Sequence, residues 1–191
     1  IFKFAGKLRD YDISKREWVL DGDTVMYGAA FELKMALDYD FEQERNFNYK
    51  NLRIEEIVRH ITFFVSRLWQ IHAFGEGNTR TTAVFTIKYL RSMGYKVDND
   101  IFAQNSWYFR NALVRANYKN LKEGIEENPV YLERFFRNLI LGENNELKKQ
   151  VDSVISLKEG QSLPSGYRIS HLYGYDMFAQ CKGVETLCVL T

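Results

Sequence analysis

Apolar residues return every three or four positions in three long stretches of the chain, which is the spacing of one face of an α-helix. The longest stretch runs from Arg53 to Ile71. The second runs from Asn78 to Met93, and a glycine, a common residue just beyond a helix end, follows it. The third lies between Asn128 and Gly142, with Pro129 at the first helical position. The pattern therefore predicts a mostly helical protein.

Two further stretches also predict helices, and the first of these is the weaker one. One covers Ser106 to Asn117. The other follows Asp23 and Thr24, which are favourable N-cap residues. This second stretch places four apolar residues on one helical face: Met26, Ala30, Leu33 and Leu37.

Strand signals are confined to the first part of the chain. Tyr11 to Ser14 and Trp18 to Leu20 predict a short β-hairpin that turns between them, with an irregular loop as the alternative. A lone hairpin is only marginally stable in water, so this one would have to pack against the helices. Residues 143–191 begin with a polar run and show no clear periodicity. We predict one helical domain over residues 1–142, followed by a linker and a tail of unknown role.

Composition and charge exclude several classes of protein. The 26 Lys and Arg residues are balanced by 25 Asp and Glu residues, so charge implies no nucleic-acid partner. The two cysteines, Cys181 and Cys188, form neither a disulfide framework nor a paired metal motif, which favours a reducing compartment. The longest apolar runs are too short to cross a bilayer. We therefore expect a cytoplasmic protein without a membrane segment.

The segment from His72 to Arg80 contains the clearest candidate chemistry. It predicts a tight loop that leads into the start of a helix, where free backbone N–H groups and the helix dipole favour phosphate oxygens. Gly75 and Gly77 permit close approach of the backbone to a ligand. Asn78 adds an amide donor, and Arg80 adds a forked cation in the first helical turn.

Two further residues of this loop suit a transfer reaction. His72 is neutral and basic near pH 7, and Glu76 is a hard oxygen ligand of the kind that Mg²⁺ accepts beside nucleotide phosphates. Each also has a simpler interpretation: a buried structural histidine and a carboxylate that complements a helix dipole. A transition-metal pair would need a third ligand, which the sequence does not offer. His60, inside the preceding helix, is interpreted as structural.

The order His72-x-Phe74-x-Glu76-Gly77-Asn78-x-Arg80 resembles the signature of the Fic (filamentation induced by cAMP) family. The opening Phe4-Ala5-Gly6 with Arg9 resembles the segment that leads into the family's flap. The resemblance covers about residues 1–141 and implies a Fic-fold helical bundle with a hairpin flap. Because the chain opens without Met, we expect its Fic domain to be truncated at the N-terminus.

The resemblance implies transfer of a nucleoside monophosphate, usually AMP from ATP, to a Tyr, Thr or Ser hydroxyl of a target protein. His72 would be the general base and Glu76 would hold Mg²⁺. The phosphates would lie against the loop and helix start, formed by Gly75, Glu76, Gly77, Asn78, Thr79 and Arg80. The flap would align the target's backbone by strand addition, through Ile13, Ser14, Lys15, Trp18, Val19 and Leu20. A base pocket is expected near residues 107–118.

Departures from the family's pattern leave the donor nucleotide open. Many members have a second Arg three residues after Arg80 that binds the terminal phosphate, and this chain has Ala83. The inhibitory pattern of Ser or Thr, three residues, Glu and then Gly or Asn is absent from the sequence, so we expect no inhibition through that contact. Position 79 is Thr rather than the Lys typical of phosphorylating toxin relatives, which favours nucleotide transfer.

Two alternatives to an adenylyltransferase remain. One is a helical module that binds a nucleotide or peptide without turnover, and the other is a phosphotransferase of the Doc toxin type. The resemblance also allows a regulatory or antitoxin partner, a bacterial source, and delivery of the protein into another cell.

Overall fold

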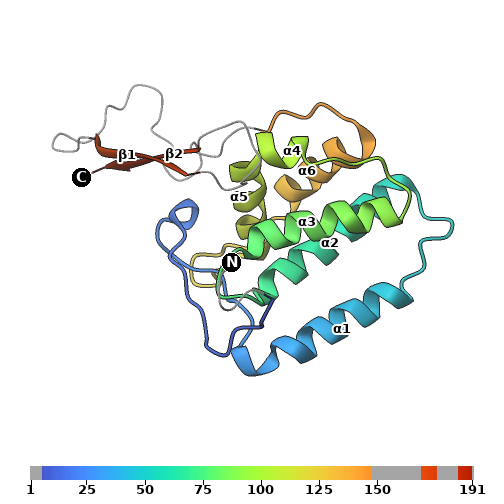
Figure 1. Cartoon of the computed structure of the whole chain (residues 1–191), viewed down its shortest axis with the longest axis horizontal. Helices are drawn as coiled ribbons and strands as arrows, with labels where there is room; N and C mark the ends of the chain where they lie inside the picture. Colours follow the sequence, from blue (N-terminus) through green and yellow to red (C-terminus); the bar gives the residue numbers. More distant parts are fainter. Residues whose placement is uncertain (1–5, 148–168, 176–184, 191) are drawn as a thin grey trace.

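The computed structural model describes residues 6–147, 169–175 and 185–190 (Figure 1). Most of the described chain is helical, as the sequence predicts. The helices are α1 (Leu33–Asn46), α2 (Ile54–Ile71), α3 (Asn78–Ser92), α4 (Asp100–Gln104), α5 (Ser106–Asn117) and α6 (Val130–Leu141), with short 3-10 helices η1 (Trp18–Leu20) and η2 (Ala30–Glu32). Two strands, β1 (Ile169–Tyr175) and β2 (Glu185–Leu190), pair in antiparallel orientation.

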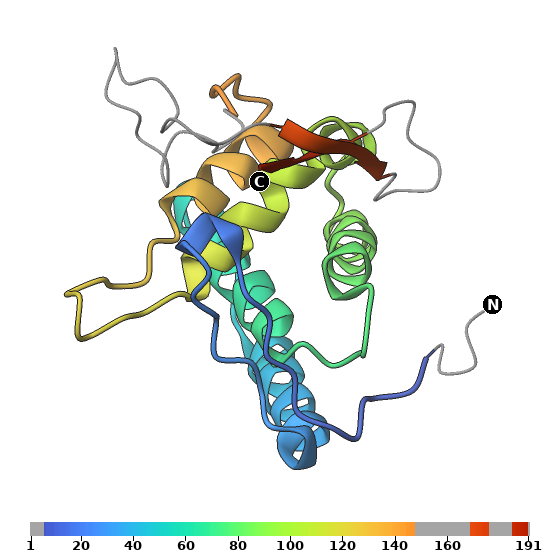
Figure 2. The ribbon, with the colours of Figure 1, turned by 90° about the vertical axis from the view of Figure 1, so that its left-hand side faces the viewer.

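Helix α2 is the central element, and α1, α3, α5 and α6 all pack against it (Figures 1 and 2). Its apolar residues recur at helical spacing, and Val58, Ile61 and Val65 are completely buried. On α6, Phe135 and Phe136 are buried as well and pack with Phe109 of α5 in one aromatic cluster. This packing anchors α2 in the core, and the loop that starts at His72 follows directly from its C-terminal end.

The bounds predicted for the helices at Arg53 to Ile71 and at Ser106 to Asn117 agree with α2 and α5. The helix predicted after Asp23 and Thr24 begins later than expected. Residues 23–29 are not helical, α1 starts at Leu33, and Met26 is exposed. The cause is that this segment bonds to the end of α2 instead of to itself: Gly28 N donates to Gln70 O at 3.3 Å, and Gln70 Nε2 donates to Met26 O at 3.2 Å.

The hairpin predicted between Tyr11 and Leu20 does not form as paired strands. Residues 12–17 have an irregular, extended course, and Trp18–Leu20 form η1. The carbonyl of Glu17 accepts N–H groups from Leu20 and from Gly22, which closes a tight turn in place of a strand ladder. The side chain of Trp18 stacks on Trp107 of α5, with ring centroids 5.2 Å apart. This segment therefore packs on α5 without pairing as a strand.

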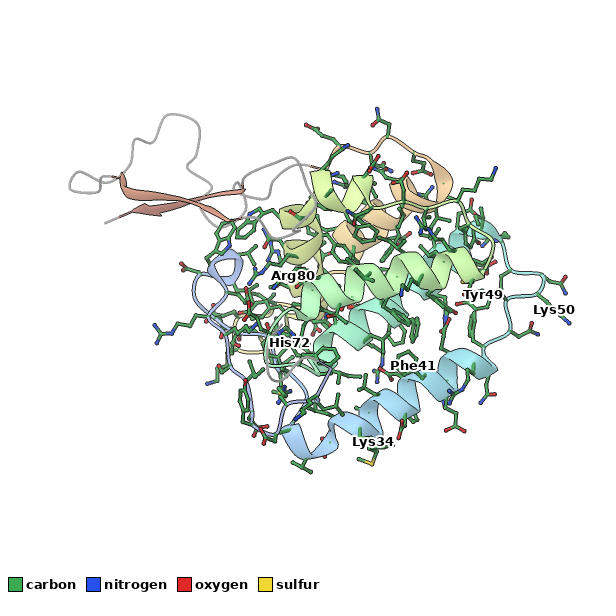
Figure 3. The ribbon with its side chains drawn as sticks, viewed as in Figure 1. Lys34, Phe41, Tyr49, Lys50, His72 and Arg80 are labelled. Atoms are coloured by element: carbon green, nitrogen blue, oxygen red, sulfur yellow. The ribbon has the colours of Figure 1, made fainter. Side chains whose placement is uncertain are left out.

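A buried polar network joins α1, α2 and α3 near the end of α1. The carboxylate of Glu44 accepts hydrogen bonds from Tyr49 and Tyr89 and lies 2.6 Å from Nε2 of His60. The ring of Phe47 stacks on the imidazole of His60. Figure 3 labels Tyr49 at the opposite end of these helices from His72. The contacts support the structural interpretation of His60.

Among the described residues, none of the helices has the combined length and apolar character needed to cross a membrane. Helix α6 ends at Leu141, where Gly142 adopts a left-handed conformation (φ 66°) that stops the helix. The boundary proposed between residues 142 and 143 therefore coincides with a helix end, although its role as a domain boundary stays a prediction.

Candidate functional site

The backbone at His72 is where α2 stops. His72 has left-handed torsions (φ 52°, ψ 53°), and its N–H bonds to the carbonyl of Trp69 at 3.0 Å. Left-handed torsions are uncommon for a residue with a side chain and cost about 1–2 kcal/mol. Surrounding contacts must therefore hold the backbone in this conformation.

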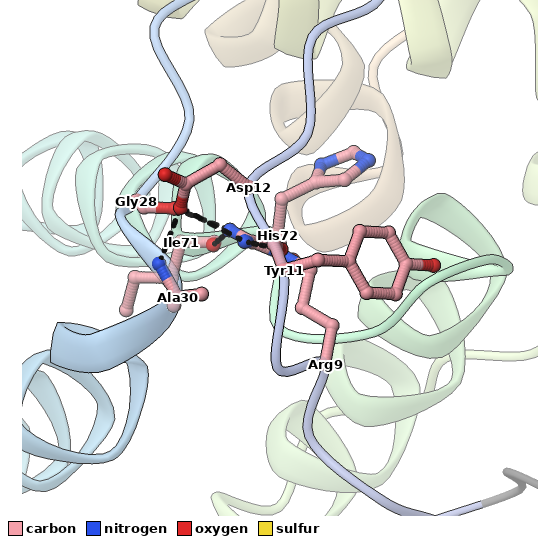
Figure 4. A network of polar contacts seen from close by, with 7 residues as sticks. All are labelled: Arg9, Tyr11, Asp12, Gly28, Ala30, Ile71 and His72. Atoms are coloured by element: carbon pink, nitrogen blue, oxygen red, sulfur yellow. Dashed lines mark hydrogen bonds and ion pairs between the residues drawn. The ribbon is translucent and has the colours of Figure 1, made fainter.

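Arg9 supplies those contacts (Figure 4). Its guanidinium is fully buried and donates to the carbonyl of His72 at 2.8 Å and to that of Ile71 at 3.3 Å. It also donates to the carbonyls of Tyr11 and Gly28, so one cation bonds three separate segments of backbone. A cation at the C-terminus of a helix is favoured by the helix dipole. In the sequence, Arg9 is notable only because it belongs to the segment that resembles the one leading into the family's flap.

The imidazole of His72 is buried, with 3% of the residue exposed, and it still lines a cavity at the end of α2. Its Nδ1 lies 3.3 Å from the carbonyl of Trp69. Because a carbonyl only accepts, Nδ1 bears the proton and Nε2 has the lone pair. Nε2 has no hydrogen-bond partner among the described residues. The arrangement thus presents a neutral, unoccupied base.

Burial is the main reason that the pKa of His72 is lowered to about 3, and the positive charges of Lys15, Arg9 and Arg110 lower it further. The ring of Tyr27 covers one side of the imidazole at a centroid distance of 4.1 Å. At pH 7 the side chain is therefore in the form that can accept a proton.

Helix α3 begins beside this imidazole. Gly77 has φ 77°, a conformation that favours glycine, and the first i→i−4 bond of the helix runs from Thr81 N to Gly77 O at 2.9 Å. The backbone N–H groups of residues 78–80 precede that bond and have no i→i−4 partner inside the helix. The loop therefore leads into a helix start with free backbone N–H groups, and anion binding by these groups stays a prediction.

Two residues of the predicted phosphate site make contacts that shape the loop. Asn78 is buried, accepts a bond from the N–H of Phe74 at 2.9 Å and donates to its carbonyl at 2.6 Å. Thr79 accepts a bond from the indole N–H of Trp69 at 3.0 Å, which joins the start of α3 to the end of α2. Both side chains therefore position the loop through protein contacts.

The two charged residues of the loop are more exposed. The carboxylate of Glu76 lies 3.6 Å from the guanidinium of Arg80, and their side chains are 69% and 46% exposed. An ion pair this exposed is weak, so both groups stay available to a ligand. Figure 3 shows His72 and Arg80 at the same end of the neighbouring helices α2 and α3. Gly75 lies against Tyr11, whose hydroxyl would be 2.6 Å from an added Cβ.

The cavity has a volume of about 310 Å³. Its wall combines the loop motif with residues of three other segments: Lys15, Glu17, Trp69, His72, Glu76, Gly77, Asn78, Thr79, Arg80 and Arg110. Trp69, Glu17 and Arg110 were not predicted as site residues, and the last two are charged. Nothing in their local sequence distinguishes them from surface charges, because the fold alone brings them to the loop.

The predicted flap residues have divergent surroundings. Lys15 lines the cavity, and Trp18 stacks on Trp107. Val19 and Leu20 are buried in the hydrophobic core, so their side chains are not available to a target in this conformation. Ile13 is half-buried and Ser14 is exposed. In the stretch proposed for a base pocket, Tyr108, Phe109 and Tyr118 belong to the core.

Protonation of His72 should oppose folding. The unfolded side chain takes up a proton below about pH 6.5, whereas the buried one resists protonation down to about pH 3, so stability is lost as the pH falls through this range. Between pH 7 and pH 5 the wild type should lose about 2 kcal/mol more unfolding free energy than His72→Asn. Urea unfolding of both proteins at both pH values measures this. If the difference in unfolding free energy between the two proteins were the same at pH 7 and pH 5, burial would not be what lowers the pKa of His72.

Known proteins are similar to this chain in sequence family and in fold. Residues 1–90 match the model of the Fic/DOC family. Among curated proteins, none matches the chain. A solved structure of the N-terminal Fic domain of a Bartonella effector protein, from Bartonella sp. AR 15-3, aligns with a TM-score of 0.54 and 20% identity over 72% of this chain and 63% of that one.

Two other Bartonella effectors give similar values. The BepC protein from Bartonella tribocorum, solved with bound AMPPNP, has a TM-score of 0.53 and 20% identity over 72% of this chain and 66% of that one. The N-terminal FIC domain of Bep8 from Bartonella sp. 1-1C has a TM-score of 0.53 and 20% identity over 73% and 65%. The present chain thus spans less than two thirds of the length of each. Residues 1–90, which contain the complete His72-to-Arg80 motif, belong to the Fic/DOC family, and the helical fold around them is a Fic fold.

Proposed function

We propose that this protein is a nucleotidyltransferase that moves a nucleoside monophosphate, AMP in the first instance, from a nucleoside triphosphate to a hydroxyl of a target protein. The single observation on which the proposal rests is that Nε2 of His72 has no hydrogen-bond partner within the described part of the chain, while His72 and the start of α3 line the same cavity. A buried nitrogen without a partner is costly, and a function as proton acceptor gives a reason for it.

His72 acts on the target in the proposed reaction. Nε2 takes the proton of a Tyr, Thr or Ser hydroxyl as its oxygen attacks the α-phosphorus of the donor. A new bond forms between that oxygen and phosphorus, the bond from phosphorus to the bridging oxygen breaks, and pyrophosphate leaves. Nδ1 stays bonded to the Trp69 carbonyl throughout, which keeps the lone pair on Nε2.

The start of α3 holds the phosphates. Free N–H groups of residues 78–80 and the guanidinium of Arg80 are donors to the phosphate oxygens, and Gly77 lets the backbone approach them. Asn78 and Thr79 contribute through the loop shape that their protein contacts maintain. Positioning and charge stabilisation of this kind provide most of the catalysis in phosphoryl chemistry.

Glu76 is the residue that would hold Mg²⁺. Among the described residues no three acidic, histidine or cysteine side chains converge as a metal site. A single exposed carboxylate on the cavity wall nevertheless fits Mg²⁺, which commonly takes one or two protein carboxylates and completes its shell with phosphates and water. When bound, the ion neutralises charge that develops on the phosphates.

The double-label experiment tests this function. Purified protein is mixed with a cell lysate, MgCl₂ and either α-labelled or γ-labelled nucleoside triphosphates, and the labelled proteins are separated. We expect the α-label to appear on a protein target and the γ-label to leave with pyrophosphate. All four nucleoside triphosphates are compared, because the chain has Ala83 in place of the second Arg and the identity of the donor nucleotide is therefore not fixed by the motif.

The other outcomes identify the alternatives. Transfer of the γ-label would make the protein a phosphotransferase of the Doc type. Nucleotide binding without any transfer would favour a non-catalytic module. Adding candidate regulatory or antitoxin partners to the same assay shows whether transfer is restrained in trans.

A further inference from the structure

A second guanidinium lies on the cavity wall, on a different element from the loop motif. Arg110 belongs to α5, and its Nη2 is 2.6 Å from a carboxylate oxygen of Glu17. Glu17 is 1% exposed, and its other oxygen accepts a bond from the hydroxyl of Tyr27 at 3.1 Å. Both partners of this ion pair line the same cavity as His72.

The ion pair fixes Arg110 in place without using all its donors. A guanidinium has five N–H groups, and one of them is enough for the contact with Glu17. The guanidinium carbon Cζ of Arg110 also lies 5.6 Å from the ring centroid of Trp107, which itself stacks on Trp18. Arg110 is thus held on two sides while part of it faces the cavity.

Lys15 brings another cation to the same wall. Burial, followed by the charge of Arg110, lowers the pKa of Lys15. With Arg80, the cavity wall has three cationic side chains and two carboxylates, Glu17 and Glu76. Like charges that converge on one cavity repel each other, and a bound anion would relieve that repulsion. The helix start adds further positive potential.

We propose that Arg110, positioned by Glu17, forms with Lys15 a subsite for the distal phosphates of the donor, which makes the cavity select a triphosphate over a monophosphate. This inference rests on the nucleotide transfer proposed above. Helix α3 gives no such cation one turn beyond Arg80, because that position is the uncharged and completely buried Ala83. The charge that α3 lacks one turn beyond Arg80 comes instead from α5 and from the segment before η1.

Affinities for ATP and AMP test the subsite, because AMP lacks the distal phosphates. The dissociation constants of the whole chain are measured by calorimetry with MgCl₂, and that of AMP by displacement of labelled ATP. The variants are Lys15→Gln, Arg110→Lys and the charge-neutral pair Glu17→Gln with Arg110→Gln. The pair is used because Arg110→Gln alone would leave a buried carboxylate without a counter-charge. Arg16→Gln, an exposed neighbour outside the cavity, is the matched control.

We expect the double variant to weaken the affinity for ATP by about 10- to 100-fold, the size of a lost hydrogen bond to a charged group. The affinity for AMP should fall by less than about twofold. Lys15→Gln should weaken the affinity for ATP by about 3- to 10-fold and leave the affinity for AMP unchanged. The ATP affinity of Arg110→Lys should lie between those of the wild type and the double variant. Lys15 is only half-buried, so its variant keeps the test valid if the double variant fails to fold.

Two results would overturn the subsite. Equal loss of ATP and AMP affinity would mean that Arg110 only fastens the segment before η1 to α5. An unchanged ratio of the two affinities in Lys15→Gln and Arg110→Lys would mean that neither cation contacts the distal phosphates. If the wild type transfers nucleotide while the ratio stays unchanged, the subsite alone is wrong. If the wild type binds no nucleotide, the proposed function is overturned as well.

Discussion

Replacing His72 with Asn should reduce transfer of α-labelled nucleotide by about 10²- to 10⁴-fold, the usual contribution of a general base. Asn is the better first substitution because it tolerates the left-handed backbone that His72 adopts at the end of α2. The side chain that accepts the proton is thereby removed with little backbone strain. His72→Ala should lose the same activity, with an added cost to stability from the backbone torsions.

The histidine inside α2, His60, provides the control. His60 is bonded to Glu44 and stacked on Phe47, away from the cavity, so His60→Gln should transfer nucleotide at the wild-type rate per folded molecule. Initial rates are compared after the folded fraction of each protein is measured by circular dichroism. Equal rates for wild type and His72→Asn would remove His72 from the mechanism.

The part of the site that could be predicted from sequence is the part that is local in sequence. His72, Glu76 and Arg80 fall within one loop and the first turn of one helix, so their spacing alone places them close together. Their convergence on a cavity follows from the C-terminal stop of α2 and the start of α3. The helical fold was likewise predictable, because its core positions recur at the helical period.

The rest of the site depends on contacts between distant segments. Glu17 and Arg110 are 93 residues apart, and only the packing of η1 on α5 brings them together. Charged residues on weakly periodic segments look like solvated surface in a single sequence. The roles of Asn78 and Thr79 were similarly hidden, because their bonds to Phe74 and Trp69 depend on the folded loop.

The errors in secondary structure have the same origin. The residues after Asp23 suit a helix by local pattern, yet their backbone bonds to Gln70 and to Arg9. The segment expected as a hairpin instead forms a turn whose Trp18 stacks on α5. In both places tertiary contacts outweigh local preference, which differs by less than about 1 kcal/mol per residue between ordinary residues.

Replacing Arg9 with Met should lower the free energy of unfolding by about 3–5 kcal/mol. The substitution keeps most of the side-chain volume and removes the donors to four backbone carbonyls, and a hydrogen bond to a charged group is commonly worth about 1.5–3 kcal/mol. Because two of those carbonyls belong to Ile71 and His72, the last turn of α2 should loosen and transfer activity should also fall. Urea unfolding followed by tryptophan fluorescence measures the stability.

Two further variants separate this account from a general effect of losing a positive charge. Arg16→Met removes an exposed arginine from the same segment and should change stability by less than about 0.5 kcal/mol. Arg9→Lys keeps the charge but has a single ammonium in place of the planar fork, so it cannot reach all the carbonyls and should recover only part of the loss. Full recovery in Arg9→Lys would show that charge at the helix end, rather than the fork of hydrogen bonds, stabilises the left-handed turn at His72.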